Sequence, residues 1–204
     1  MPTNITDVAR AMMARGVDEA DLGYALELTM SSASARKQGH QVPLMRLLLD
    51  AGARASRSGV LAAAAYREAE ALRALLQCGH PVDAPIAAAL GDDARLRELV
   101  TTAGAEDVQT AFALAVVNGH VEAARIALDA GADVDAYMPV HAHSTALHQA
   151  AADDDVAMID LLLSRGARTD QRDTLWDGTP LDWAIHVNRP AARAALARAE
   201  PKRP

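Results

Sequence analysis

The chain has 204 residues, a formal net charge of −7 and a single cysteine, and aromatic residues make up only 3% of it. Its arginines and few lysines are scattered without a basic stripe, so we expect no binding to nucleic acid, which needs such a stripe to neutralise phosphate. No apolar stretch approaches 18 residues without a charge, Met1–Arg15 has no apolar signal segment, and Cys78 has no partner for an internal disulfide. Together these features predict a cytoplasmic protein without a membrane span.

The first expected elements are helices. Residues 4–15 can form an amphipathic helix, and we expect a capping helix over residues 1–16 that covers the first unit of the fold. A cluster of leucines before Gly52 then predicts the aliphatic helix of a unit over residues 18–52. These leucines are Leu44, Leu47, Leu48 and Leu49.

Two less regular units are expected next, over residues 58–82 and 83–104. In the first of them, Ser58 precedes Gly79 by 21 residues. In the second, Gly104 follows Gly79 by only 25 residues, so its turn must be truncated. Their aliphatic positions are Leu72, Leu75 and Leu76, followed by Ile86, Leu90, Leu96, Leu99 and Val100.

The clearest internal repeat lies further along the chain. Thr110 precedes Gly131 by 21 residues, Thr145 precedes Gly166 by the same distance, and Thr179 follows Thr145 by 34 residues. We predict that each threonine is the N-cap of a short alanine-rich helix and that each glycine stops an aliphatic helix in the left-handed conformation. A period in the low thirties indicates stacked repeats. The expected units cover 108–135, 143–170 and 177–200, and 201–204 are expected to be a disordered tail.

Four segments carry a family resemblance: Asn118-Gly-His120, Gly131-Ala-Asp-Val-Asp135, Thr145-Ala-Leu-His148 and Asp177-Gly-Thr-Pro-Leu181. They resemble the ankyrin repeat, with its Thr-Pro-Leu-His signature, most closely over residues 108–190. The resemblance implies an all-α ankyrin-repeat solenoid of about six helix-turn-helix units, in a single domain over 1–200, whose concave face binds other macromolecules. It also implies kinship with short bacterial ankyrin-repeat proteins.

The segment Tyr137–Ser144 is the longest connection between the regular units. If it is extended, His141 and His143 project to the same side, and His148 would be the third ligand of a zinc site. However, His148 stands at the histidine of the family signature, where the resemblance implies a structural hydrogen bond between repeats. Two histidines without a third ligand do not make a metal site, so we predict neither a metal nor a cofactor.

Both tryptophans fall near the C-terminus, at Trp176 and Trp183. The family register places Trp183 in the concave groove, where it is either an anchor for a partner or a cap over the last repeat. Trp176 is expected to pack on its own hairpin and is kept among the residues near the partner. The predicted partner-binding residues are Leu114, Asn118, Tyr137, His141, His143, Gln149, Asp153, Trp176, Trp183 and His186.

Signs of catalysis are weak. Cys78 and His80 flank a helix C-terminus, which raises a thiol's pKa, and Ser144 beside His143 has no glycine-rich elbow. Asp153–Asp155 lacks the ligand spacing of a calcium loop. We therefore predict a monomeric, non-enzymatic scaffold that binds a protein partner. The alternative is a small-molecule or metal-responsive module, or an unusual enzyme, built on the histidines and tryptophans of the C-terminal units.

Overall fold

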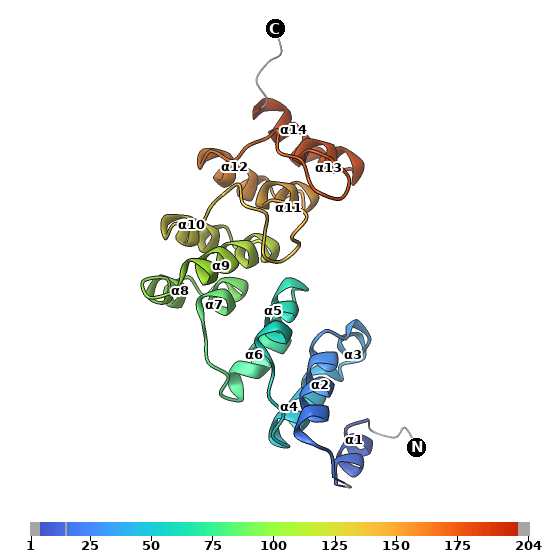
Figure 1. Cartoon of the computed structure of the whole chain (residues 1–204). Coiled ribbons are helices and arrows are strands. Elements are labelled where there is room, and N and C mark those ends of the chain that lie inside the picture. Colours follow the sequence, from blue (N-terminus) through green and yellow to red (C-terminus); the bar gives the residue numbers. More distant parts are fainter. Residues whose placement is uncertain (1–4, 15, 200–204) are drawn as a thin grey trace. The chain divides into compact units, whose positions relative to one another are not determined.

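A computed structural model describes residues 5–14 and 16–199 of the chain (Figure 1). Over these residues it contains α-helices and no strand, and one isolated antiparallel bridge joins Tyr137 to Thr145. The predicted all-α class is confirmed. The chain falls into two compact units, one up to Val82 and one from Asp83 onward.

The first unit is built from helices α1 to α6. Their bounds are α1 (Ile5–Met13), α2 (Glu19–Met30), α3 (Ala33–Lys37), α4 (Gln41–Asp50), α5 (Arg57–Ala65) and α6 (Ala69–Gln77). Helix α2 packs on α4 and α5 packs on α6, while α1 contacts α4. Leu26 and Met45 are buried between the paired helices. The buried carboxylate of Glu68 joins the elements through hydrogen bonds from Arg36 and Gln41.

The second unit consists of four helix pairs. They are α7 (Ala84–Leu90) with α8 (Asp93–Leu99), α9 (Ala105–Asn118) with α10 (Val121–Asp129), α11 (Ala146–Ala152) with α12 (Val156–Ser164), and α13 (Pro180–His186) with α14 (Pro190–Ala199). The first helices of successive pairs contact one another, and so do the second helices, which makes two layers (Figure 1). Phe112, Leu147 and Leu162 are buried between these layers and account for the aliphatic pattern of the sequence.

The caps of the last two repeats agree with the sequence. Thr145 and Thr179 are the N-caps of α11 and α13, and each closes a reciprocal capping box with the residue three positions later. Gly131 and Gly166 have φ angles of 101° and 84°, in the region where glycine avoids the strain of a Cβ atom. The predicted starts and stops of these helices are therefore confirmed.

Three other predicted boundaries are wrong. Thr110 is not an N-cap, because Gly104 caps α9 and the helix has already begun at Ala105. The Thr110 side chain is buried, and its hydroxyl donates to the carbonyl of Glu106 at 2.8 Å. Gly104 thus opens α9 and does not end the preceding unit in a left-handed turn. In the first unit, Ser56 caps α5 in place of Ser58.

The predicted single domain over 1–200, with its unit boundaries, stays a prediction. The proposed capping helix is present as α1 between Ile5 and Met13, but residues 1–4 and 15 of its predicted range are outside the described residues. The predicted tail at 201–204 also lies outside them. Among the residues that are described, no helix is long and apolar enough to cross a membrane.

Candidate partner-binding site

Two loops precede the last two helix pairs and lie against each other. We call residues 137–144 the first finger and residues 171–178 the second finger. The backbone N–H of Thr174 donates to the carbonyl of His143 at 2.9 Å, and the Tyr137 hydroxyl donates to the carbonyl of Arg172 at 2.7 Å. These two bonds connect neighbouring repeats, so the fingers form one surface.

The first finger is not extended, so the condition under which His141 and His143 would project to the same side is not met. His141 has a φ of 57°, in the left-handed region, and its carbonyl accepts a hydrogen bond from the Ser144 backbone N–H at 3.0 Å. The chain therefore turns at His141. The rings of His141 and His143 meet edge to face, with centroids 6.4 Å apart. They do not project side by side, as two residues of an extended strand would.

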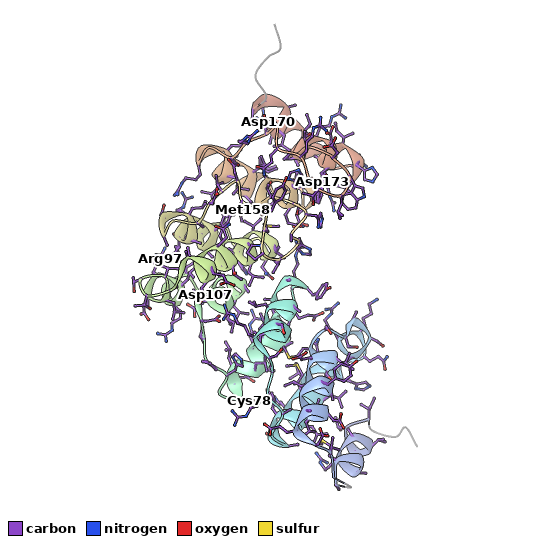
Figure 2. All side chains as sticks on the ribbon, viewed as in Figure 1. Cys78, Arg97, Asp107, Met158, Asp170 and Asp173 are labelled. Atoms are coloured by element: carbon purple, nitrogen blue, oxygen red, sulfur yellow. The ribbon has the colours of Figure 1, made fainter. Side chains whose placement is uncertain are left out.

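Asp173 organises the second finger (labelled in Figure 2). Its side chain is only 3% exposed. One carboxylate oxygen accepts from the backbone N–H groups of Leu175 and Trp176, at 2.9 and 2.7 Å. The other accepts from the Gly178 N–H and from the Trp183 indole N–H, both at 2.9 Å. Asp173 thereby ties the finger to helix α13.

Burial alone would raise the pKa of the Asp173 carboxyl. The hydrogen bonds from the Trp183 indole and the backbone N–H groups outweigh that effect and hold this pKa far below its ordinary value of 3.8. Gly178 must be small here, because a Cβ atom would lie 3.2 Å from the Asp173 carboxylate and 3.3 Å from the Trp183 ring. The finger is therefore built around an ionised and fully hydrogen-bonded carboxylate.

His148 links two repeats, as the family resemblance implied, and that prediction is confirmed. Its Nδ1 accepts from the Thr145 backbone N–H at 3.3 Å, so its Nε2 carries the proton and donates to the Gly178 carbonyl at 3.0 Å. Burial is the main cause that lowers the pKa of His148, although the bond to Gly178 and the charge of Asp173 partly oppose it. The imidazole is thus held neutral.

This lowered pKa makes stability depend on pH. Because the unfolded chain takes up a proton near pH 6.5 and the folded chain resists it, the contribution of His148 is present above pH 6.5 and is lost as the pH falls below it. We expect wild-type stability to fall from pH 7 to pH 5 in urea titrations. His148→Asn should lower the free energy of unfolding at pH 7 by about 1–3 kcal/mol and flatten this slope. His80→Asn, in the first unit, is the control; an unchanged slope in His148→Asn would contradict the assignment.

The aromatic side chains of the fingers and of α11 and α13 form one cluster. The His143 ring stacks on Trp183 with centroids 5.8 Å apart and an interplanar angle of 28°. Trp176 meets Trp183 edge to face at 5.5 Å, and His148 meets Trp183 from the other repeat at 5.2 Å. Trp183 is half-buried, whereas Trp176 is 70% exposed. Aromatic surface is therefore presented to solvent on a rigid base.

Beside this cluster lies a pocket of about 710 Å³, within the range of specific binding sites. We call it the aromatic pocket. Its lining residues are His141, His143, Gln149, Ala152, Trp176, Gly178, Asp182, Trp183, His186 and Val187. It opens between the fingers and the exposed sides of α11 and α13, all within the second unit.

The structure thus brings together six of the residues that the sequence analysis proposed: His141, His143, Gln149, Trp176, Trp183 and His186. Asp153 lies beside them, with its carboxylate 3.4 Å from the Gln149 amide nitrogen. Tyr137 is at the start of the first finger and is partly exposed. Their role in binding a partner stays a proposal.

Two predicted residues lie elsewhere. Leu114 has no exposed surface, because α9 is covered by α7, α10 and α11. The prediction that Leu114 contacts a partner is therefore corrected, since a partner cannot reach this side chain. Asn118 is half-buried near the end of α9, and its amide donates to the Leu114 carbonyl at 2.9 Å. Neither residue lines the aromatic pocket.

The sequence analysis missed Asp173, Asp182 and Val187. Asp182 stands three residues after the N-cap Thr179, and that capping-box spacing is a signal that was present in the sequence. The role of Asp173 depends on a bond to Trp183, ten positions away, and no local pattern predicts it. Over the part of the chain that the structure describes, no group of three or more His, Cys, Asp or Glu side chains is arranged to hold a metal ion.

Four stacked helix pairs, the last two of which are preceded by fingers, define a helical repeat protein. Comparison with family models gives the particular family: residues 84–173 match the model of ankyrin repeats, in three copies. Residues 84–173 of the chain are therefore similar to ankyrin repeats. Ankyrin repeats generally mediate protein–protein interaction. A search of curated proteins found no match to the chain.

Proposed function

We propose that the chain is a non-enzymatic scaffold that binds a protein partner through the aromatic pocket and the two fingers. The observation that carries this proposal is the exposed indole of Trp176, held beside Trp183 on an ordered loop. Tryptophan is enriched where binding energy concentrates, because it buries a large area and loses few rotamers on binding. Leu175, next to it in the second finger, is also exposed.

The rigidity of the site supports the same proposal. The backbone N–H groups of Leu175 and Trp176 are both bonded to Asp173, so the loop that carries these exposed side chains does not have to be ordered when a partner binds. Flanking groups that donate and accept, among them Gln149 and His186, suit the polar rim of an interface. We further propose that the protein acts as a monomer in a bacterial cytoplasm, without binding nucleic acid.

The second candidate function is a small-molecule binding module. The size of the aromatic pocket favours it, since enclosed sites for small molecules have similar volumes. A thermal-shift screen of metabolites, together with the metal content of the purified protein, separates the two functions. A small molecule that raises the melting temperature, and that no protein from the lysate displaces, would favour the small-molecule binding module.

We expect Trp176→Ala to weaken partner binding by more than about tenfold, or about 1.4 kcal/mol, while the melting curve stays close to that of the wild type. The reason is that this indole is exposed and supports little of the core. The measurement is a quantitative pull-down from the native lysate, followed by titration of the captured protein.

Tyr24→Ala is the matched control, because Tyr24 is an equally exposed aromatic residue in the first unit. The partner should be retained by the wild type and by this control and lost by Trp176→Ala. The double change His141→Ala/His143→Ala should also reduce binding. Equal capture by all variants would refute the proposed site.

A further inference from the structure

The aromatic pocket offers two kinds of group to a ligand: aromatic ring faces and carboxylate charge. Trp176 and Trp183 stand 5.5 Å apart at an interplanar angle of 63°, so their faces point in different directions. Asp182 lines the same pocket, and the lining contains no lysine or arginine. The face of an indole carries partial negative charge and attracts a cation placed within about 6 Å of it.

The charges around the pocket favour a positive ligand. Asp173 is ionised at the edge of the Trp183 ring, where it accepts the hydrogen bond from the indole N–H. Bonds from the Thr179 backbone N–H and hydroxyl lower the pKa of Asp182, so it is ionised as well. Two arginines are near: Arg172 pairs with Asp177 and its charge also lowers the pKa of Asp182, and Arg189 donates to the Ala152 carbonyl at 2.6 Å.

The bond between Trp183 and Asp173 adds to this preference. An indole N–H that donates to a carboxylate is polarised by it, and electron density shifts toward the ring. This polarisation strengthens the attraction of a cation to the Trp183 ring, which lines the pocket. The same bond fixes the ring, so the attraction needs no rearrangement on binding.

We propose that the aromatic pocket binds an arginine side chain from a basic segment of the partner, a proposal that rests on the proposed function. A guanidinium is planar and weakly hydrated, so it stacks on an indole and forms paired hydrogen bonds to a carboxylate such as Asp182. The formal charge of −7 on the chain attracts a basic segment at long range. The occupant is thus a protein segment selected by positive charge as well as by apolar area.

The test compares two short peptides that differ only at the central residue, arginine or citrulline. Citrulline has the shape of arginine but a neutral side chain. Both tryptophans of the chain border the pocket, so intrinsic tryptophan fluorescence reports on this site alone. We expect the arginine peptide to bind about tenfold more tightly than the citrulline peptide at physiological salt. Free N-acetyltryptophanamide, titrated in parallel, corrects for collisional quenching.

A double-mutant cycle then assigns the effect to the ring face. Trp176→Leu keeps an apolar side chain but removes the π face, and Trp183 remains as the reporter. This change should weaken binding of the arginine peptide about fivefold or more and leave binding of the citrulline peptide nearly unaffected. Because Trp176 is exposed, the variant should keep the wild-type melting temperature.

Equal affinity for the two peptides, or tighter binding of a peptide with glutamate at the centre, would overturn the assignment of arginine. Equal losses for both peptides in Trp176→Leu would overturn it too, because the ring would then act through apolar area alone. These results leave the proposed function standing if a lysate partner is still lost on Trp176→Ala. Conversely, a partner that binds Trp176→Ala as tightly as the wild type refutes the proposed function, whatever the affinities of the two peptides are.

Discussion

Replacing Asp173 with alanine is expected to lower the free energy of unfolding by about 2–4 kcal/mol, because four hydrogen bonds to a buried carboxylate are lost together. The second finger should lose its order, and Trp183 should lose its fixed orientation. Urea titration followed by tryptophan fluorescence measures both effects, since the only tryptophans are Trp176 and Trp183.

Asp173→Asn removes the charge and also places an amide NH2 group against two N–H donors, so the pH dependence of its effect reports on the charge. Because the folded-state pKa is depressed, the stabilisation by the carboxylate is present above the unfolded value of 3.8 and is lost as the pH falls below it. The wild type should therefore be more stable than Asp173→Asn at pH 7, and the difference should begin to narrow below about pH 4 and shrink further as the pH falls toward the folded-state pKa of Asp173. Asp170→Asn, at an exposed ion pair with Arg168, is the control and should change stability little. A constant difference at all pH values would show that the charge is not involved.

Leu162→Ala is expected to lower the free energy of unfolding by about 2–5 kcal/mol, because the Leu162 side chain is fully buried in α12 and its removal leaves a cavity. Helix α12 contacts α10, α11 and α14, so the loss should spread to neighbouring repeats, whose interfaces hold the unit together. Hydrogen exchange should show weaker protection in α10 and α14 as well as in α12.

The control for this change is Leu163→Ala, one residue further along the same helix. Leu163 is half-buried, so its replacement should cost clearly less. If the two variants melted at the same temperature as the wild type, the packing register of α12 would be wrong. If Leu163→Ala were the more damaging change, the buried face of the helix would be misassigned.

The candidate site shows how far a sequence alone leads toward function. The family register predicted that Gln149, Trp183 and His186 share one surface, and all three line the aromatic pocket. Equivalent positions of adjacent repeats lie side by side, so a repeat spacing carries tertiary information. The same register failed for Leu114, because it does not indicate which helix faces are covered by neighbours.

Local chemistry was determined by the sequence itself. The N-caps Thr145 and Thr179 and the left-handed glycines Gly131 and Gly166 depend on contacts within a few residues, and a sequence pattern contains all of those contacts. Thr110 shows the limit of such a pattern. Thr110 is not an N-cap because the longer helix α9 already begins at Ala105, with Gly104 as its N-cap and acidic residues in its first turn.

Only the tertiary structure decided how the pocket is built. The contact of the two fingers joins different repeats, and the bond of Asp173 to Trp183 joins a loop to the helix that follows it. Their energies come from desolvation and from hydrogen bonds that exist only after the repeats have stacked. The repeat spacing thus determined the scaffold, and long-range packing determined the charge and the aromatic faces that the scaffold presents.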